Sequence, residues 1–333
     1  MSVREAGEKE NVVIRAGDCS LTLLPALGGK IASLRLETPG TGTTELLQTP
    51  LKSYGPVTRS TPFSDADASG WDECLPSVAA CEIETHAGLA TIPDHGDIWR
   101  VPAQILSSTE DSATLRVNCF SLPLQLTRSL ILTEATSGWR LQLLYSLTNV
   151  GAYPAPWSWS AHPLFAVDPG DRIVLPEAIH TLRIEGSARQ RLGRNGSTIP
   201  WPKAGTAQGR DGELSADPAI DLSVAQPIGS GIGDKLFAGP LASAQQGWAS
   251  LERAQIGLRL TVRFEPSLTP FLGLWLCYGG WPDSTGRKQM CVALEPSTAP
   301  VDALSQTGDW SRQLEPGDTF TWPMELFVEK TKN

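Results

Sequence analysis

Histidine is the side chain best suited to proton transfer near neutral pH, and two of the four histidines in this chain stand in distinctive positions. His162 precedes Pro163, and a proline holds the residue before it in an extended conformation. His95 precedes Gly96, where the missing side chain lets a ligand approach the backbone closely. A buried histidine at a strand end is an equally good interpretation of His162. The other two histidines are expected to be structural.

Glu295 ends an apolar, strand-like segment and is followed by Pro296. Burial at such a position favours the neutral acid unless a partner or hydrogen bonds hold the carboxylate ionised. A carboxylate in such a position is uncommon, and a structural carboxylate that accepts turn amides is the alternative to a chemical role. Trp275 belongs to an aromatic-rich segment nearby, over 270–281, which could stack on a sugar ring. Core packing explains those aromatic residues equally well.

The segments that would position these residues show apolar and polar residues in alternation, which is typical of half-buried antiparallel strands. The alternation is clear over 139–148 and 256–264. The 31 glycines and 26 prolines are suited to turns between strands, and helical periodicity is almost absent apart from a short turn near 301–305. We therefore predict an all-β chain that forms a large antiparallel β-sandwich with very little helix.

The strand pattern continues on both sides of the middle of the chain. We therefore expect a single domain over residues 11–330, preceded by a flexible N-terminus over residues 1–10. Residues 187–220 are rich in Gly, Ser, Arg and Pro, and we expect them to form a long excursion on the surface.

Charge and cysteine usage exclude several classes of function. A net charge of −9 argues against nucleic acid or an anionic membrane as partner, because both need basic patches. The chain has no run of eighteen apolar residues, and its first ten residues lack the apolar core of a signal peptide. The six cysteines form no CxxC pair, which argues against a zinc site. We expect a cytoplasmic protein with reduced thiols and no bound metal.

Three pairs in this order, His95-Gly96, His162-Pro163 and Glu295-Pro296, resemble the pattern of the aldose 1-epimerase (galactose mutarotase) family. That family also carries an aspartate that opens a strand before the third pair, and Asp234 resembles it. The resemblance spans about residues 11–330 and indicates a divergent branch of the family.

The resemblance implies an antiparallel β-supersandwich of the galactose mutarotase type, with an open concave face that binds a monosaccharide. The glutamate that matches Glu295 would take the proton of the anomeric hydroxyl. The histidine that matches His162 would protonate the ring oxygen, so that the ring opens. The counterpart of His95 would hydrogen-bond near the ring oxygen, and that of Asp234 would bind sugar hydroxyls. Such chemistry needs one acid and one base and no cofactor.

The chain also departs from the family pattern. The family usually has an Asn-Arg pair ahead of its first histidine, and this arginine contacts the sugar. In this chain residues 69–76 occupy that place, with the sequence Ser-Gly-Trp-Asp-Glu-Cys-Leu-Pro. Trp71, with Asp72 or Glu73, could replace those contacts by stacking and by binding hydroxyls. Arg100 and Trp275 complete the set of candidate sugar-binding residues. These changes leave the acid/base pair intact and affect the choice of sugar.

These observations favour a cofactor-independent enzyme that interconverts the α and β anomers of a free aldose. A non-catalytic carbohydrate-binding β-sandwich is the first alternative. Glycoside cleavage is the second, with Glu295 and either Asp72 or Glu73 as paired carboxylates. The acidic charge favours a neutral monosaccharide over a sugar phosphate as the small-molecule partner. We expect a monomer or a weak homodimer.

Overall fold

The computed structural model describes residues 11–38, 42–66, 68–207, 214–242, 246–282 and 286–331. Every regular element in these ranges is a β-strand or a three-residue 3-10 helix, which confirms the all-β prediction. The expected flexible N-terminus, residues 1–10, lies outside the described residues. No helix in the described ranges is long and apolar enough to cross a membrane. Cytoplasmic location and oligomeric state stay predictions.

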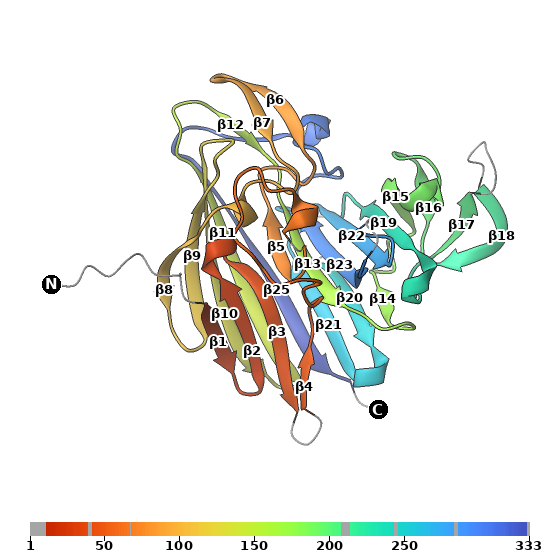
Figure 1. Cartoon of the computed structure of the whole chain (residues 1–333). Helices are drawn as coiled ribbons and strands as arrows, with labels where there is room; N and C mark the ends of the chain where they lie inside the picture. The colour runs from red at the N-terminus through yellow and green to blue at the C-terminus, as the bar shows by residue number, and fades with distance from the viewer. Residues whose placement is uncertain are drawn as a thin grey trace.

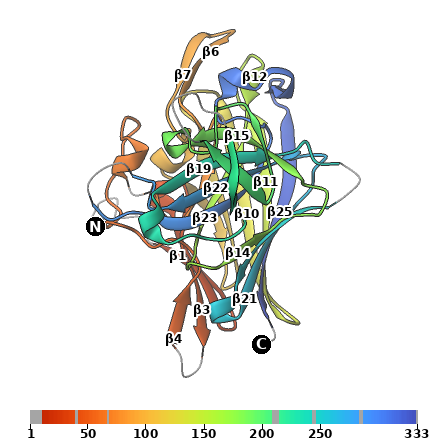
Figure 2. The same ribbon diagram turned by 90° about the vertical axis from the view of Figure 1, so that its right-hand side faces the viewer.

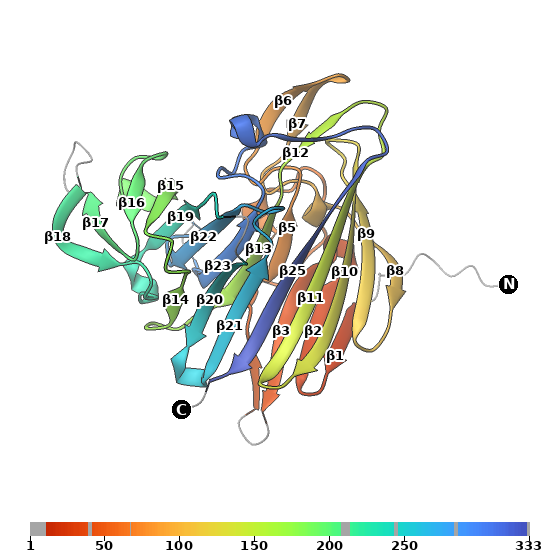
Figure 3. The same cartoon turned by 180° about the vertical axis from the view of Figure 1, so that it is seen from behind.

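Two large antiparallel sheets face each other as layers (Figures 1 and 3). The larger sheet contains, in spatial order, β1 (Val12–Ala16), β2 (Cys19–Leu24), β3 (Lys30–Thr38), β5 (Trp71–Cys74), β13 (Ser160–Ala166), β23 (Met290–Ser297), β22 (Phe271–Tyr278), β19 (Ile232–Ala238), β15 (Thr181–Ser187) and β16 (Thr198–Pro200), with β4 (Gly42–Glu45) beside β3. The smaller sheet contains β14 (Arg172–Val174), β20 (Gly247–Arg253), β21 (Leu258–Phe264), β25 (Thr319–Lys330), β11 (Gly138–Asn149), β10 (Leu124–Ala135), β9 (Ser112–Asn118) and β8 (Gln104–Ser108).

Short elements decorate the two sheets. Three two-stranded pairs are β6 (Cys81–Thr85) with β7 (Gly88–Ile92), β12 (Ala155–Trp157) with β24 (Arg312–Leu314), and β17 (Lys203–Ala207) with β18 (Leu214–Asp221). The 3-10 helices are η1 (Pro25–Leu27), η2 (Phe63–Asp65), η3 (Ile98–Arg100), η4 (Ala188–Gln190), η5 (Ile228–Ser230), η6 (Ala254–Ile256), η7 (Leu304–Gln306) and η8 (Gly308–Trp310).

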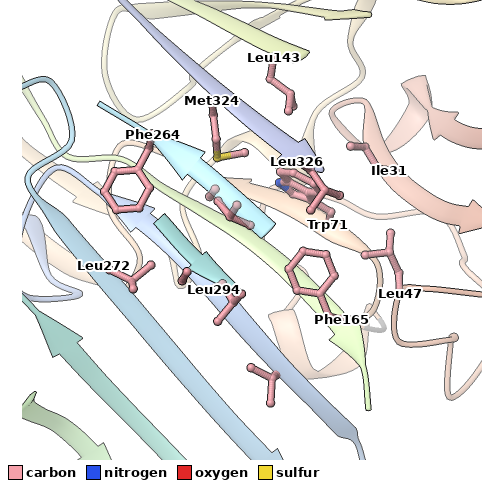
Figure 4. Close-up of a cluster of buried hydrophobic side chains, with 14 of the residues drawn as sticks. Ile31, Leu47, Trp71, Leu143, Phe165, Phe264, Leu272, Leu294, Met324 and Leu326 are labelled. Atoms are coloured by element: carbon pink, nitrogen blue, oxygen red, sulfur yellow. The ribbon is translucent and has the colours of Figure 1, made fainter. Parts of the chain in front are cut away.

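The hydrophobic core lies between the two sheets. Figure 4 shows Trp71 and Phe165 of the larger sheet packed with Met324 and Leu326 of β25 in the smaller sheet. The smaller sheet follows the predicted alternation: inward residues of β11 are buried, and their neighbours along the strand are more exposed. The strand predicted over 256–264 begins two residues later, at Leu258, because Ile256 belongs to η6.

The central strands of the larger sheet are buried on both faces. All residues of β19 are buried, and so are all but one in each of β13, β22 and β23. One face packs on the core, and loops cover the other. Figure 2 looks onto β15, β19, β22 and β23 on this covered side. The covered outer face is where side chains from neighbouring strands can converge without disturbing the core.

The expected surface excursion over 187–220 is only partly correct. Its described residues include β16, which forms one edge of the larger sheet. Ile199 of β16 and Leu192 before it are fully buried, so this part of the segment packs against the core. The pair β17 and β18 lies at the same end of the molecule (Figure 1).

Candidate active site

A pocket opens on the outer face of the larger sheet, over β13, β19, β22 and β23. It is partly open to solvent and has a cavity volume of about 170 Å³. Its polar lining includes His95, His162, Lys235, Glu295 and Asp302. The three residues predicted as catalytic, distant in sequence, therefore line one pocket.

Strand pairing places His162 beside Glu295. In the β13–β23 ladder Leu164 pairs with Ala293 and Ser160 with Ser297, so His162 and Glu295 occupy the position between these pairs. His162 Nε2 lies 4.0 Å from Glu295 Oε1. Both side chains are on the outer face, since alternation along β23 turns Leu294 into the core. An imidazole and a carboxylate are thus held side by side at the floor of the pocket.

Glu295 is fully buried, and its two carboxylate oxygens have different surroundings. Oε2 accepts a hydrogen bond from the Lys235 ammonium and a longer one, 3.5 Å, from Ser160 Oγ. Oε1 has no hydrogen-bond partner among the described residues. Burial raises the pKa of Glu295 above its ordinary value, while Lys235 acts against this increase and Asp302 adds to it. The carboxylate therefore offers one free oxygen, on the side of His162.

The surroundings of His162 favour the neutral form of its imidazole. Burial lowers the pKa of His162 well below its ordinary value, and positive charge at His95, Lys235 and Lys30 acts in the same direction. Its Nδ1 is buried without a partner within the described part of the chain. Nε2 faces the pocket and the free oxygen of Glu295. A proton on this imidazole would be strongly acidic.

His95 stands on a tight loop whose backbone is in the left-handed region. The φ angles of His95 and Gly96 are 58° and 67°, and a side chain at Gly96 would place its Cβ 2.2 Å from the carbonyl oxygen of Leu75. The His95 ring stacks on Phe63 with centroids 3.5 Å apart, and it meets the His162 ring edge-on at 5.3 Å. Glycine is thus needed directly after His95 to bring this imidazole to the pocket.

Arg100 holds this loop instead of lining the pocket. Its Nη1 donates to the carbonyl oxygens of Asp94, at 2.6 Å, and Gly96, at 2.5 Å, and its Nε donates to that of Thr61 at 3.3 Å. The guanidinium also lies over the Trp99 ring, 4.0 Å from its centroid. The prediction that Arg100 contacts the sugar is not supported, because Nε and Nη1 donate to backbone carbonyls and the residue does not line the pocket.

Trp275 lines the pocket as expected, together with Trp281 and Phe63. In the β19–β22 ladder Trp275 pairs with Lys235, so the indole lies next to the ammonium on the outer face. Phe63 and Trp281 approach each other with ring centroids 6.4 Å apart. These rings give the pocket apolar walls of the kind that bind the non-polar faces of sugars.

Asp234 does not line the pocket. It is adjacent to Lys235 in β19, and successive residues of a strand point to opposite faces. Its carboxylate accepts hydrogen bonds from Ser187 Oγ, at 2.7 Å, and from Arg191. The sugar-binding role expected for Asp234 is therefore at odds with its position, and Lys235 takes the place facing the pocket.

Of the residues expected to replace the family's Asn-Arg pair, Trp71 and Glu73 point between the sheets, whereas Asp72 is on the outer face outside the pocket. Trp71 is fully buried in the core, as Figure 4 shows. Glu73 lies between the sheets, where its carboxylate accepts hydrogen bonds from Arg128 (2.8 Å), Tyr145 (3.0 Å) and Trp159 (2.9 Å). Asp72 pairs with His162 in the β5–β13 ladder but is bound by Lys30 at 2.7 Å. None of these three lines the pocket.

Sequence reasoning missed Lys235, Asp302 and Phe63. The one available signal for Lys235 was a lysine inside an otherwise apolar strand, and Asp234 beside it carried the same signal. Asp302 lies in the segment after β23, where no pattern singles it out. No group of three or more His, Cys, Asp or Glu residues within the described ranges could hold a metal ion.

Comparison with known proteins supports the fold. No protein family model matches the sequence, and no curated protein matches it. Among solved structures, a candidate aldose 1-epimerase from Escherichia coli K12 has 19% identity and a TM-score of 0.66, covering 96% of this chain and 99% of its own. A galactose mutarotase related enzyme from Lactobacillus acidophilus has 13% identity and a TM-score of 0.62, covering 97% and 99%. A galactose mutarotase-like protein from Lactobacillus casei has 16% identity and a TM-score of 0.60, covering 96% and 100%. The chain has the galactose mutarotase-like fold, as the resemblance implied.

Proposed function

We propose that the protein interconverts the α and β anomers of a free aldose by acid/base opening of the sugar ring. The observation that carries this proposal is the pairing of His162 Nε2 with the free oxygen of Glu295, 4.0 Å apart at the floor of an aromatic-walled pocket. Ring opening of a hemiacetal needs one base and one acid close together, and this pair supplies both.

In the proposed reaction Glu295 Oε1 accepts the proton of the anomeric hydroxyl while the bond between C1 and the ring oxygen breaks. His162 donates a proton from Nε2 to the ring oxygen, which becomes a hydroxyl. Rotation about the C1–C2 bond then presents the other face of the aldehyde. Ring closure with the two roles reversed returns both protons and releases the other anomer.

The two side chains share one proton in the active state. Burial raises the pKa of Glu295 and lowers that of His162. The state with a neutral imidazole and a protonated carboxyl group therefore competes with the state with an imidazolium and a carboxylate. Both forms contain the same number of protons, and the titration belongs to the pair. The low pKa of His162 also makes its imidazolium a strong proton donor, which a weakly basic ring oxygen requires.

The charges of the pocket favour a neutral monosaccharide. Asp94, Glu295 and Asp302 contribute carboxylates to the lining, against the single ammonium of Lys235. A sugar phosphate would meet like charges, which disfavours its binding. Trp275 and Trp281 provide apolar surfaces for the C–H faces of a pyranose.

Glycoside cleavage has less support from the geometry. Two carboxylates that cleave a glycoside must leave room for substrate and water between them. Glu295 and Asp302 both line the pocket, but both approach the same ammonium group, that of Lys235. Glu73, one of the expected partners, lies between the sheets. A non-catalytic sugar-binding protein remains the alternative that the experiment must separate.

Anomer exchange measured by saturation-transfer NMR tests the proposal. A panel of neutral free aldoses is compared with and without the protein, and a sugar phosphate serves as the charged control. We expect catalysed exchange for at least one neutral aldose and none for the phosphate. Binding of neutral aldoses without any faster exchange would establish the binding protein instead.

A further inference from the structure

We infer that Lys235 is a positioning residue of this pocket: its ammonium holds Oε2 of Glu295 and thereby makes Oε1 the reacting oxygen. This inference rests on the proposed function and adds a residue to it. The arrangement is a line of three charged groups, with the Lys235 Nζ bonded to Glu295 and 3.6 Å from Asp302 Oδ1.

The fold holds the ammonium in place from several sides. Lys235 is 8% exposed, and it lies between Trp275, its partner in the ladder, and Phe237, whose ring centroid is 5.3 Å from Nζ. A buried ammonium is costly unless it is paired, and two carboxylates pair with it here. Burial would lower the pKa of Lys235, but Asp302 and Glu295 outweigh that effect and raise it, so the group stays charged.

The two oxygens of Glu295 are thereby assigned different tasks. Oε2 is occupied by Lys235 and Ser160, whereas Oε1 is buried, without a partner among the described residues, and faces His162. A carboxylate fixed through one oxygen cannot rotate freely, so its second oxygen keeps a constant direction. General-base catalysis depends on that direction because the base must reach the proton that it abstracts.

The same ammonium sets the pH range in which the pair works. The charged and titratable groups that face Glu295 are Lys235 from β19, Asp302 after β23, His95 from its loop, His162 from β13 and the Cys74 thiol from β5. Those that face His162 also include Lys30. Lys235 acts on both groups, as His95 does, and it favours the less protonated state of each. Without Lys235, the pKa values of Glu295 and His162 should both rise.

Asp302 provides a test in the opposite direction. Its carboxylate raises the pKa of Glu295, because two like charges near each other resist ionisation. Replacing it with asparagine keeps the shape of the side chain and removes that repulsion. The variants Lys235→Met and Asp302→Asn should therefore move the acid limb of the pH profile in opposite directions, which a purely structural role would not produce.

The experiment measures the pH dependence of anomer exchange in the full-length protein and in four variants. Lys235→Met removes the charge, Lys235→Arg keeps it, and Asp302→Asn removes the opposing carboxylate. Lys203→Met is the matched control, since Lys203 is an exposed lysine of β17. In parallel, carbon-13 NMR of labelled glutamate side chains follows the titration of the Glu295 carboxyl, assigned with Glu295→Gln, without any sugar.

We expect the acid limb of Lys235→Met to move up by about 1–3 pH units, the range by which a neighbouring cation shifts a carboxylate. Its rate at the wild-type optimum should fall by roughly tenfold or more. Asp302→Asn should move the limb to lower pH. The acid limb of Lys235→Arg should lie closer to that of the native protein than the acid limb of Lys235→Met does. The acid limb of Lys203→Met should coincide with that of the native protein.

An acid limb that stays in place in both Lys235→Met and Asp302→Asn would overturn the inference. If Lys235→Met does not fold, the direction of the shift in Asp302→Asn decides alone, and a shift to higher pH or none contradicts the inference. If the native protein exchanges no sugar, the proposed function fails, but the Glu295 titration still reports on Lys235. An unchanged Glu295 titration in Lys235→Met would then reject the positioning role separately.

Discussion

Gly273 lies directly across from Glu295 on the neighbouring strand β22, and a methyl group on it would lie 3.1 Å from Oε2 and 3.2 Å from the Glu295 Cβ. Glycine at this position leaves space for the buried carboxylate and its ammonium partner. The direction of the proposed general base therefore depends on a residue that carries no functional group.

Gly273→Ala should displace the Glu295 side chain by a few tenths of an ångström and loosen its alignment with His162. We expect the exchange rate to fall about tenfold or more, because small misplacements of catalytic groups are costly. The melting temperature should change only slightly. Exchange NMR and thermal unfolding on the same sample check this; a native rate in the alanine variant would contradict it.

Glu295→Gln should abolish exchange while the protein keeps its fold, because the substitution is nearly isosteric and removes the base. The expected loss is about 10²–10⁴-fold. Near-ultraviolet circular dichroism, which reports on the buried tryptophans, checks the fold beside the rate. Substantial exchange in this variant would exclude Glu295 as the base.

His162→Asn should lower the exchange rate by about 10²–10⁴-fold and change the shape of its pH profile. In the native protein the rate should decline at high pH, since the pair loses the proton that it shares. In the variant only Glu295 titrates, so the residual rate should rise with pH to a plateau. A basic limb that persists in His162→Asn would identify another group as the proton donor.

Glu73→Gln tests the position of this residue between the sheets. The substitution leaves the buried guanidinium of Arg128 without its carboxylate, and breaking a buried ion pair typically costs about 3–5 kcal/mol. We expect a loss of stability of that order in urea unfolding. The KM for any sugar should stay close to the native value. A raised KM without a loss of stability would instead indicate that Glu73 contributes to sugar binding.

Arg100→Met should destabilise the loop that carries His95. The carbonyl oxygens of Asp94 and Gly96 would lose their donor, and an unsatisfied buried group costs about 1–3 kcal/mol. We expect lower unfolding stability and a higher KM. Arg259→Met, at an exposed ion pair with Glu252, is the control and should change stability by less than about 0.5 kcal/mol.

The three motif residues were predictable because each is marked by its neighbour in the sequence: a glycine after His95 and prolines after His162 and Glu295. All three line the pocket. The all-β fold followed from alternation in the smaller sheet, where strands such as β9, β10 and β11 have one buried and one more exposed face.

The choice between Asp234 and Lys235 could not be made from the sequence. Alternation distinguishes the two faces of a strand only when one face is polar, and β19 is buried on both faces. The same reason applies to Trp71 and Glu73 in β5, whose four residues are all buried. Asp302 reaches the pocket through long-range packing, which no local pattern records.

Under the proposed function, the two faces of the larger sheet would serve different purposes. The inner face contributes to the hydrophobic core, and the outer face carries the proposed proton-transfer groups, which segments such as those around Phe63 and Trp281 enclose. We therefore expect substitutions in the enclosing segments to affect the proposed substrate preference more than the packing between the two sheets. Such a division lets selection, or a protein engineer, diversify the accepted sugars on an unchanged scaffold.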